Sequence, residues 1–170
     1  MSRNRAVLGS VAFFLAAPGI VAFVAPALIH HWRPGPATDR HPLLIPVGLT
    51  LVTLGLLALA GCFGRFALQG EGTPAPLAPT RRLVVGGLYR HVRNPMYLAV
   101  AAIILGQAVA MASLWTAVYG LVVVIATVLF VRLYEEPTLA AAFPAEWPAY
   151  AAAVPAWRPR RRAWSPEDKS

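Results

Sequence analysis

Residues 95–131 read PMYLAVAAIILGQAVAMASLWTAVYGLVVVIATVLFV and carry no charged side chain. A transmembrane helix needs about 20 predominantly apolar residues to cross the hydrocarbon core of a bilayer. The run therefore has the length of two short crossings, and the turn between them is predicted near Ser113. We expect a tight helical hairpin that occupies residues 95–136.

Two more apolar segments precede the hairpin, at residues 6–29 and 43–63. The whole chain is 58% hydrophobic and 13% charged, with a mean hydropathy of +0.59. This composition is too apolar for a soluble domain of 170 residues. The predicted fold class is an all-α integral membrane protein with about four transmembrane helices.

A single membrane domain accounts for the chain, residues 1–170. Its expected parts are two N-terminal helices, a cytoplasmic loop, the hairpin and an interfacial tail, at residues 1–69, 70–94, 95–136 and 137–170. The prolines in residues 70–80 favour an extended linker or lid within the loop.

The basic residues are distributed unevenly along this plan. Thirteen of the 15 Lys and Arg residues flank the apolar segments on one predicted side, and only Arg33 and Arg40 remain for the other. The positive-inside rule therefore places both termini and the middle loop in the cytoplasm. Because the net charge of +8 borders apolar segments, its expected partner is the anionic surface of a lipid bilayer and not nucleic acid.

The first apolar segment allows two interpretations. MSRNR, an apolar run and VAPA together resemble a secretory signal with a cleavage site. The run is also long enough to span a membrane, and we prefer that alternative. Pro18 and Pro26 predict a kinked helix whose freed carbonyl groups bind to neighbouring helices.

Metal binding is not predicted. Cys62 is the only cysteine, which excludes an internal disulfide and favours a packing role. His30, His31 and His41 lie close together in sequence, but adjacent histidines in a loop rarely converge on one ion without further ligands. An interfacial loop is the better interpretation.

Residues 89–97, YRHVRNPMY, concentrate polar side chains where the third helix begins. Arg90 and Arg93 can be lipid anchors, and Tyr89 and Tyr97 can belong to an aromatic belt. That interpretation explains the residue types but not their concentration in one short stretch. A functional site at the cytoplasmic membrane boundary is the alternative.

Local features add detail to this boundary. Asn94 before Pro95 predicts an N-cap, which would leave helix-terminal amides to attract an anion such as a carboxylate. The glycine pair at residues 86 and 87 allows the backbone to turn or to approach a ligand closely.

Two carboxylates lie where the hairpin ends. Pro137 is expected to stop the helix at Glu136. Arg132 lies three and four residues before Glu135 and Glu136, so an ion pair within the helix accounts for one of them. The second carboxylate is then available for a positively charged ligand.

The tail carries an aromatic face. Phe143, Trp147, Tyr150 and Val154 are spaced by four, three and four residues, which is one side of a helix. An interfacial segment with an aromatic belt is predicted, followed by acidic-lipid binding through the basic residues 158–162.

GLYRHVRNPMYLA, the apolar hairpin and EEPTLAAAFPAEWPAYAAAVPAWRP together resemble the isoprenylcysteine carboxyl methyltransferase family and the related phospholipid methyltransferases. The resemblance covers about residues 80–160. It implies S-adenosyl-L-methionine as the methyl donor, bound at the cytoplasmic face between the hairpin and the tail.

The resemblance also implies roles for particular residues. The positions that match the cofactor-binding motifs are Gly87, Tyr89, Asn94, Pro95, Tyr97, Glu135 and Glu136. Arg93, which matches an arginine that orients the methyl acceptor, and Tyr97 are the implied catalytic residues. The departures from the family pattern concern mainly the tail, and they are Leu88, Asn94, Pro144, Trp147 and Ala156.

The implied activity is methyl transfer to a carboxylate or an amine of a lipid or isoprenoid-like acceptor from the bilayer. Such a transfer mainly requires positioning of donor and acceptor and exclusion of water. A carboxylate acceptor only has to be held by Arg93, whereas an amine must first lose a proton. His91 is a candidate base, and an exposed interfacial histidine is the alternative for it.

Two other functions stay open at this point. A small helical scaffold or transporter would use the paired glutamates only in ion pairs. A membrane reductase of the sterol type would bind NADPH instead of a methyl donor. The sequence defines neither the acceptor nor the oligomeric state.

Overall fold

A computed structural model describes residues 18–69 and 83–165, and the regular secondary structure in these two ranges is helical, without a strand. The predicted all-α class is thus confirmed for this part of the chain. The expectations for residues 1–17, 70–82 and 166–170 lie outside the described residues. They include the signal-like start and most of the proline-rich linker.

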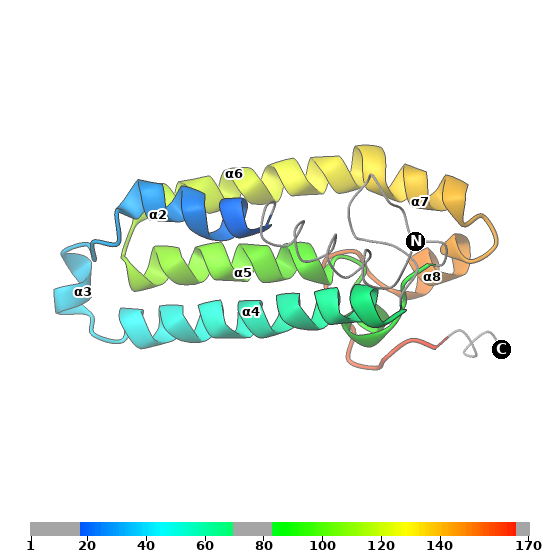
Figure 1. Ribbon diagram of the computed structural model, residues 1–170, viewed down its shortest axis with the longest axis horizontal. Helices are drawn as coiled ribbons and strands as arrows, with labels where there is room; N and C mark the ends of the chain where they lie inside the picture. The colour runs from blue at the N-terminus through cyan, green and yellow to red at the C-terminus, as the bar shows by residue number, and fades with distance from the viewer. Residues whose placement is uncertain (1–17, 70–82, 166–170) are drawn as a thin grey trace.

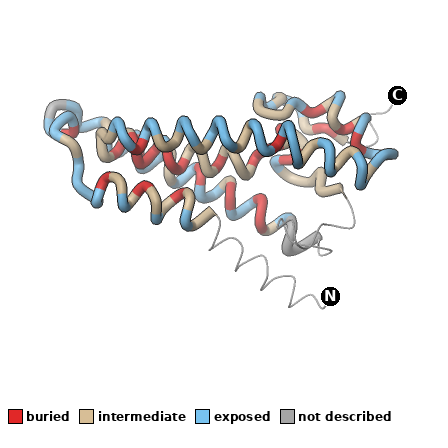
Figure 2. The backbone as a smooth tube through the Cα atoms, turned by 90° about the horizontal axis from the view of Figure 1, so that it is seen from above, coloured by how far each residue is buried: buried red, intermediate tan, exposed pale blue. Residues whose placement is uncertain are grey.

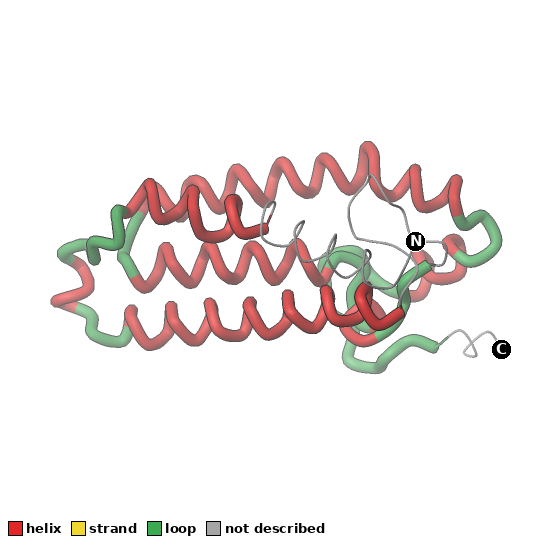
Figure 3. Tube along the Cα trace, in the orientation of Figure 1, coloured by secondary structure: helices red, strands yellow, loops and turns green. Residues whose placement is uncertain are grey.

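The described elements form an elongated bundle (Figure 1). In chain order they are a π-helical turn η1 (Ile20–Val24), α2 (Ala25–His30), α3 (Ala37–Arg40), α4 (Leu44–Gln69), a 3-10 turn η2 (Gly87–Arg90), α5 (Pro95–Ala110), α6 (Leu114–Phe130), a second π-helical turn η3 (Val131–Glu135), α7 (Glu136–Ala142) and α8 (Trp147–Ala153). Helices α4, α5 and α6 lie side by side, α3 lies at one end, and α7 and α8 lie at the other. The loops gather at these two ends (Figure 3).

Among the described residues, two helices are long and apolar enough to cross a membrane, Leu44–Arg65 and the continuous helix Leu114–Ala142. Only 17% and 11% of their most apolar windows are buried inside the protein. A core helix of a soluble protein would be mostly buried, whereas the outer sides of these helices are exposed and apolar (Figure 2). The apolar segments Ile20–His30 and Pro95–Ala110 are shorter.

Helices α4 and α5 pack with their backbones in direct contact. A Cβ atom at Gly48 would overlap the carbonyl oxygen of Gly106, and one at Gly106 would lie 2.6 Å from that of Gly48. At Gly55 a Cβ atom would meet Ile103 at 2.7 Å. Small residues that allow such close approach are typical of helix pairs in membranes.

The glycine contact predicts a position-specific effect of alanine. Gly48→Ala should lower the thermal stability of the protein in detergent by about 1–3 kcal/mol, because the added methyl group forces α4 and α5 apart. Gly61→Ala is the matched control on the same helix, since a Cβ atom there has no neighbour within 4 Å. The control should be neutral or stabilising, because alanine favours helix over glycine. Equal melting temperatures for the two variants would contradict the contact.

A short turn at residues 111–113 joins α5 to α6. Ser113 is the N-cap of α6, and its Oγ accepts a hydrogen bond from the backbone N–H of Thr116 at 3.3 Å. The predicted turn near Ser113 is therefore confirmed.

Pro26 is accommodated by the turn that precedes it. A proline ring has no N–H to offer to the carbonyl groups one turn earlier. The Val21 carbonyl instead accepts from the Tyr119 hydroxyl at 2.9 Å, and the Ala22 carbonyl accepts from Gln107 Nε2 at 2.6 Å. Neighbouring helices thus bind the freed carbonyls, as predicted for this proline.

Pro137 does not stop its helix, so that prediction is wrong. Glu136 has helical dihedral angles, φ −61° and ψ −44°, and the helix continues to Ala142. The wider π-helical turn η3 ends two residues before Pro137, just as η1 ends two residues before Pro26. A π-helical turn changes the hydrogen-bond register, so the helix can continue past the proline ring.

The tail forms a small core of its own. Trp147, Tyr150, Val154 and Trp164 are buried together, and Phe143 packs against them. The predicted helical face is confirmed. The expected aromatic belt is wrong for Trp147 and Tyr150, because their side chains face this cluster and not the outside.

Candidate functional site

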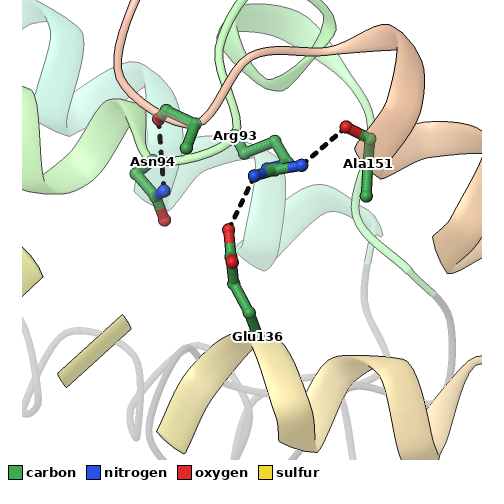
Figure 4. A network of polar contacts seen from close by, with 5 residues as sticks. Arg93, Asn94, Glu136 and Ala151 are labelled. Carbon is green, nitrogen blue, oxygen red and sulfur yellow. Dashed lines mark hydrogen bonds and ion pairs between the residues drawn. The ribbon is translucent and has the colours of Figure 1, made fainter. Parts of the chain in front are cut away.

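The polar stretch before α5 and the two carboxylates after α6 meet at one end of the bundle. Arg93 Nη2 donates to Glu136 Oε1 at 2.8 Å, and the Tyr97 hydroxyl donates to Glu135 Oε2 at 2.8 Å (Figure 4 for the first pair). The two pairs join segments 43 and 38 residues apart in sequence. A ligand at this end can therefore contact both segments.

Arg93 is the most connected side chain of the site. Its Nη1 donates to the Ala151 carbonyl at 2.7 Å, and its guanidinium lies 5.6 Å from the ring centroid of Trp147. The side chain is only 15% exposed. Its Nε is buried and has no hydrogen-bond acceptor among the described residues, so one N–H donor is left over.

Glu135 and Glu136 both face α5. The expected ion pair with Arg132 is wrong, because the carboxylates bind Tyr97 and Arg93 instead. The physical reason is the π-helical turn, which contains Arg132 and Glu135 and changes the side-chain register from that of an α-helix. Both carboxylates are therefore directed into the site.

Asn94 occupies the N-cap position of α5 but does not cap the helix with its side chain. Its Nδ2 donates to the Ala156 carbonyl at 3.1 Å (Figure 4). The prediction of a side-chain cap is therefore wrong, because the tail provides a competing acceptor. Pro95 is the first residue of α5, as predicted, and no acceptor is seen among the described residues for the amides of Met96 and Tyr97.

Tyr89 is buried next to the site and does not present an open aromatic face. It is 9% exposed, and its carbonyl accepts from the Tyr150 hydroxyl at 2.8 Å. Burial raises the pKa of Tyr89 well above its ordinary value, and Cys62 and Glu135 raise it further. Burial also raises the pKa of Tyr150, partly offset by Arg93. Cys62 is buried beside Tyr89, and its predicted packing role is confirmed.

Gly87 turns the chain into the site. Its φ is +62°, a conformation that favours glycine, and a Cβ atom there would lie 2.9 Å from Arg65 Nε. The backbone at Gly87 does approach another group closely, as predicted, and this group is the side chain of Arg65 near the end of α4.

Gly87→Ala should therefore be destabilising by about 1–2 kcal/mol, through backbone strain and the contact with Arg65. Thermal unfolding in detergent measures the loss. Gly86→Ala is the control, because the φ of Gly86 is −93° and suits any residue. Removing the Arg65 side chain in Arg65→Ala should recover only the steric part of the loss. Full recovery would show that the backbone is not strained.

The tail binds directly to the stretch before α5. Arg160 N donates to the His91 carbonyl at 2.9 Å, and His91 Nδ1 is 2.9 Å from the Arg160 carbonyl oxygen. Trp164 N donates to the Arg90 carbonyl at 2.9 Å, and Arg90 Nε donates to the Trp164 carbonyl. The Arg90 side chain thus binds the tail, and His91 is a structural contact of the tail. Lipid binding by the basic residues 158–162 stays a prediction.

The sequence did not single out several groups of this site. They are the backbone carbonyls of Ala151, Ala156 and Trp164 and the ring of Trp147 in its contact with Arg93. Every residue has a carbonyl group, so no residue type marks such an acceptor. The spacing that places Trp147 on a buried face was the available signal.

No group of three His, Cys, Asp or Glu side chains in residues 18–69 and 83–165 is arranged to hold a metal ion. His30 is buried and its Nδ1 accepts from the backbone N–H of Trp32, whereas His31 and His41 are exposed. The polar groups of the site are therefore mainly two carboxylates, one arginine and backbone groups.

Comparison with known proteins gives one match. The family model described as phospholipid methyltransferase matches residues 43–146. The matched range contains both segments that meet in the site. No curated protein and no solved structure matches the chain.

Proposed function

The chain belongs to the phospholipid methyltransferase family, and from this premise we propose that it transfers a methyl group from S-adenosyl-L-methionine to a lipid acceptor at the site around Arg93. Membership supports methyl transfer in a membrane. The observation that carries the more specific proposal is the meeting of Arg93 and Tyr97 with Glu136 and Glu135, at 2.8 Å in each pair.

The donor set fits this cofactor. S-adenosyl-L-methionine supplies a methyl group on a sulfonium, and it also carries an ammonium and a carboxylate. Glu135 and Glu136 offer negative charge to its cationic groups. The unpartnered Nε of Arg93 and the first amides of α5 offer donors to its carboxylate.

Each side chain then has a distinct task. Tyr97 orients Glu135 through its hydroxyl, and Arg93 orients Glu136. Asn94 holds the tail at Ala156, so that the tail excludes water from one side of the site. Gly87, Tyr89 and Pro95 support the backbone that positions these groups.

The acceptor is proposed to be a carboxylate or an amine of a lipid or isoprenoid-like molecule. Arg93 already binds Glu136 and the Ala151 carbonyl, so holding an acceptor carboxylate would require it to exchange a partner. An amine acceptor places no such demand on Arg93. The geometry therefore supports the amine more strongly, and a prenylcysteine carboxylate is the other acceptor to test.

We further propose four membrane crossings with the site on the cytoplasmic side. Two of the described helices have the required length. The shorter segment Pro95–Ala110 packs between them, and Ile20–His30 packs against α5 and α6. Arg33 and Arg40 lie near α3, at the end of the bundle away from α7 and α8 (Figure 1). The positive-inside rule then supports cytoplasmic placement of the end that contains the site.

Cofactor binding to the purified protein tests the proposal. Isothermal titration in detergent should show that the wild type binds S-adenosyl-L-methionine. The Kd of Glu135→Gln for this cofactor should be higher by about tenfold or more. Glu146→Gln is the control, because Glu146 is exposed and lies at the same end. Binding of NADPH without binding of the methyl donor would refute the proposal in favour of a reductase.

A further inference from the structure

Arg132 ends an exposed apolar stripe on the outside of α6. Leu121, Ile125 and Leu129 are spaced by four residues on one face of α6, and Arg132 follows them in the first residues of η3. The three apolar side chains are 60%, 51% and 52% exposed, and Arg132 is exposed as well.

Arg132 has no hydrogen bond or ion pair with any residue that the structure describes. Glu135 and Glu136, its nearest acids in sequence, are bound by Tyr97 of α5 and by Arg93, which precedes α5. An exposed cation on an apolar helix surface, one turn from the site, thus lacks a counter-charge from the described protein. Leu133 next to it is 76% exposed, so the surroundings of Arg132 are those of a lipid-facing surface.

The order of groups along this helix matches the order of groups in a phospholipid. The apolar stripe comes first, Arg132 follows, and Glu135 comes next at the site. A phospholipid has its acyl chains, its phosphate and the end of its headgroup in the same order. Arginine binds phosphate oxygens with charge-assisted and often bidentate hydrogen bonds.

We infer that Arg132 is a positioning residue that binds the phosphodiester of the lipid acceptor, while an acyl chain lies along Leu121, Ile125 and Leu129. The inference rests on the proposed function and adds a substrate contact to it. The phosphate then fixes the depth of the lipid, and the end of the headgroup reaches the carboxylates, which follow Arg132 by three and four residues.

Kinetics in mixed micelles test this contact. In a non-ionic detergent, with phosphatidylethanolamine as the only phosphate-containing molecule, Arg132→Gln should raise the KM for the lipid about tenfold and leave kcat unchanged. The Kd for S-adenosyl-L-methionine should not change. Arg132→Lys should recover part of the loss, and Arg33→Gln, which removes an exposed arginine near α3 at the opposite end of the bundle, should have no effect.

A phosphate-free acceptor separates the phosphate contact from a general structural effect. With a long-chain primary amine in place of the phospholipid, wild type and Arg132→Gln should give the same KM. An equal loss with both acceptors, or an unchanged KM for the phospholipid, would overturn the inference.

Lipid retention tests the phosphate site without methyl transfer. Native mass spectrometry should show that the wild type retains phosphatidylethanolamine in preference to diacylglycerol, and that Arg132→Gln loses this preference. Retention through Arg132 by a protein that methylates no lipid would refute the proposed function and support the phosphate site. Equal preference in both proteins would refute the phosphate site, whatever the activity.

Discussion

Glu136→Gln should lower the rate of methyl transfer about 100-fold while the protein stays folded. The glutamine keeps the shape of Glu136 and an oxygen that can accept from Arg93 Nη2, so the contact with Arg93 is weakened but not removed. The negative charge is lost, and with it the electrostatic stabilisation proposed for the bound cofactor. The measurement is transfer of labelled methyl groups to lipid, together with thermal unfolding in detergent.

Glu136→Ala separates the structural part of this effect from the chemical part. It removes the acceptor completely and leaves Arg93, whose side chain is 15% exposed, with an unpaired charge. Breaking a buried ion pair costs about 3–5 kcal/mol, and the partial exposure of this pair reduces that to roughly 2–3 kcal/mol.

The control for both Glu136 variants is Glu146→Gln, which removes the same charge from an exposed position at the same end of the molecule. It should retain full activity and stability. Wild-type activity in Glu136→Gln would show that the carboxylate only holds Arg93 in place, and the proposed cofactor contact would be wrong.

Much of the fold could be predicted because it follows from local chemistry. The uncharged run of residues 95–131 is long enough for two helices, and Ser113 is a good N-cap, so the turn fell where it was expected. Pro26 lacks an N–H, so the carbonyl groups one turn earlier need donors from other helices. Gln107 and Tyr119 provide these donors.

The meeting of residues 93–97 with the paired glutamates could also be anticipated, although less directly. In an antiparallel helix pair, the start of the first helix and the end of the second lie at the same end of the bundle. Arg93 and Glu136 are opposite charges at these two positions. Because both side chains are largely shielded from water, each charge needs a partner of opposite sign, and the ion pair provides it.

Changes of register could not be predicted in this way. Spacing of three and four residues pairs Arg132 with Glu135 and Glu136 only if the helix is regular. The turn η3 is π-helical, and no single residue type signals such a turn. The prediction for Pro137 fails for the same reason, because a proline stops a helix at the preceding residue only where the helix is a regular α-helix.

The binding of the tail to the stretch before α5 could not be predicted from the sequence either. Asn94, His91 and Arg93 contact backbone carbonyls of Ala156, Arg160 and Ala151. These contacts depend on the path of the chain and not on the identity of the residues that accept. The sequence therefore predicts that Asn94 caps its own helix, and no residue pattern predicts that the tail binds the stretch before α5.

Arg93→Lys should release the tail as well as reduce activity. Arginine binds Glu136 and the Ala151 carbonyl with two different nitrogens and also faces Trp147. A lysine ammonium is a single point donor and cannot reproduce this planar arrangement. We expect activity to fall about 100-fold and local opening of the tail to become about tenfold more frequent, which corresponds to about 1.4 kcal/mol.

Limited digestion with trypsin reports on the tail independently of catalysis. The bonds after Arg160, Arg161 and Arg162 are candidate cleavage sites in a segment that is bound to His91 and Arg90 in the intact protein. Cleavage there should be about tenfold faster in Arg93→Lys if opening precedes cleavage.

Arg158→Lys is the matched control for this experiment, because Arg158 is exposed and makes no described side-chain contact. It should digest and react like the wild type. If Arg93→Lys lost activity but its tail resisted trypsin as well as the control, Arg93 would act only on the bound molecules. If the tail opened and activity persisted, water exclusion by the tail would have no part in the reaction, because methyl transfer would then proceed in an open site.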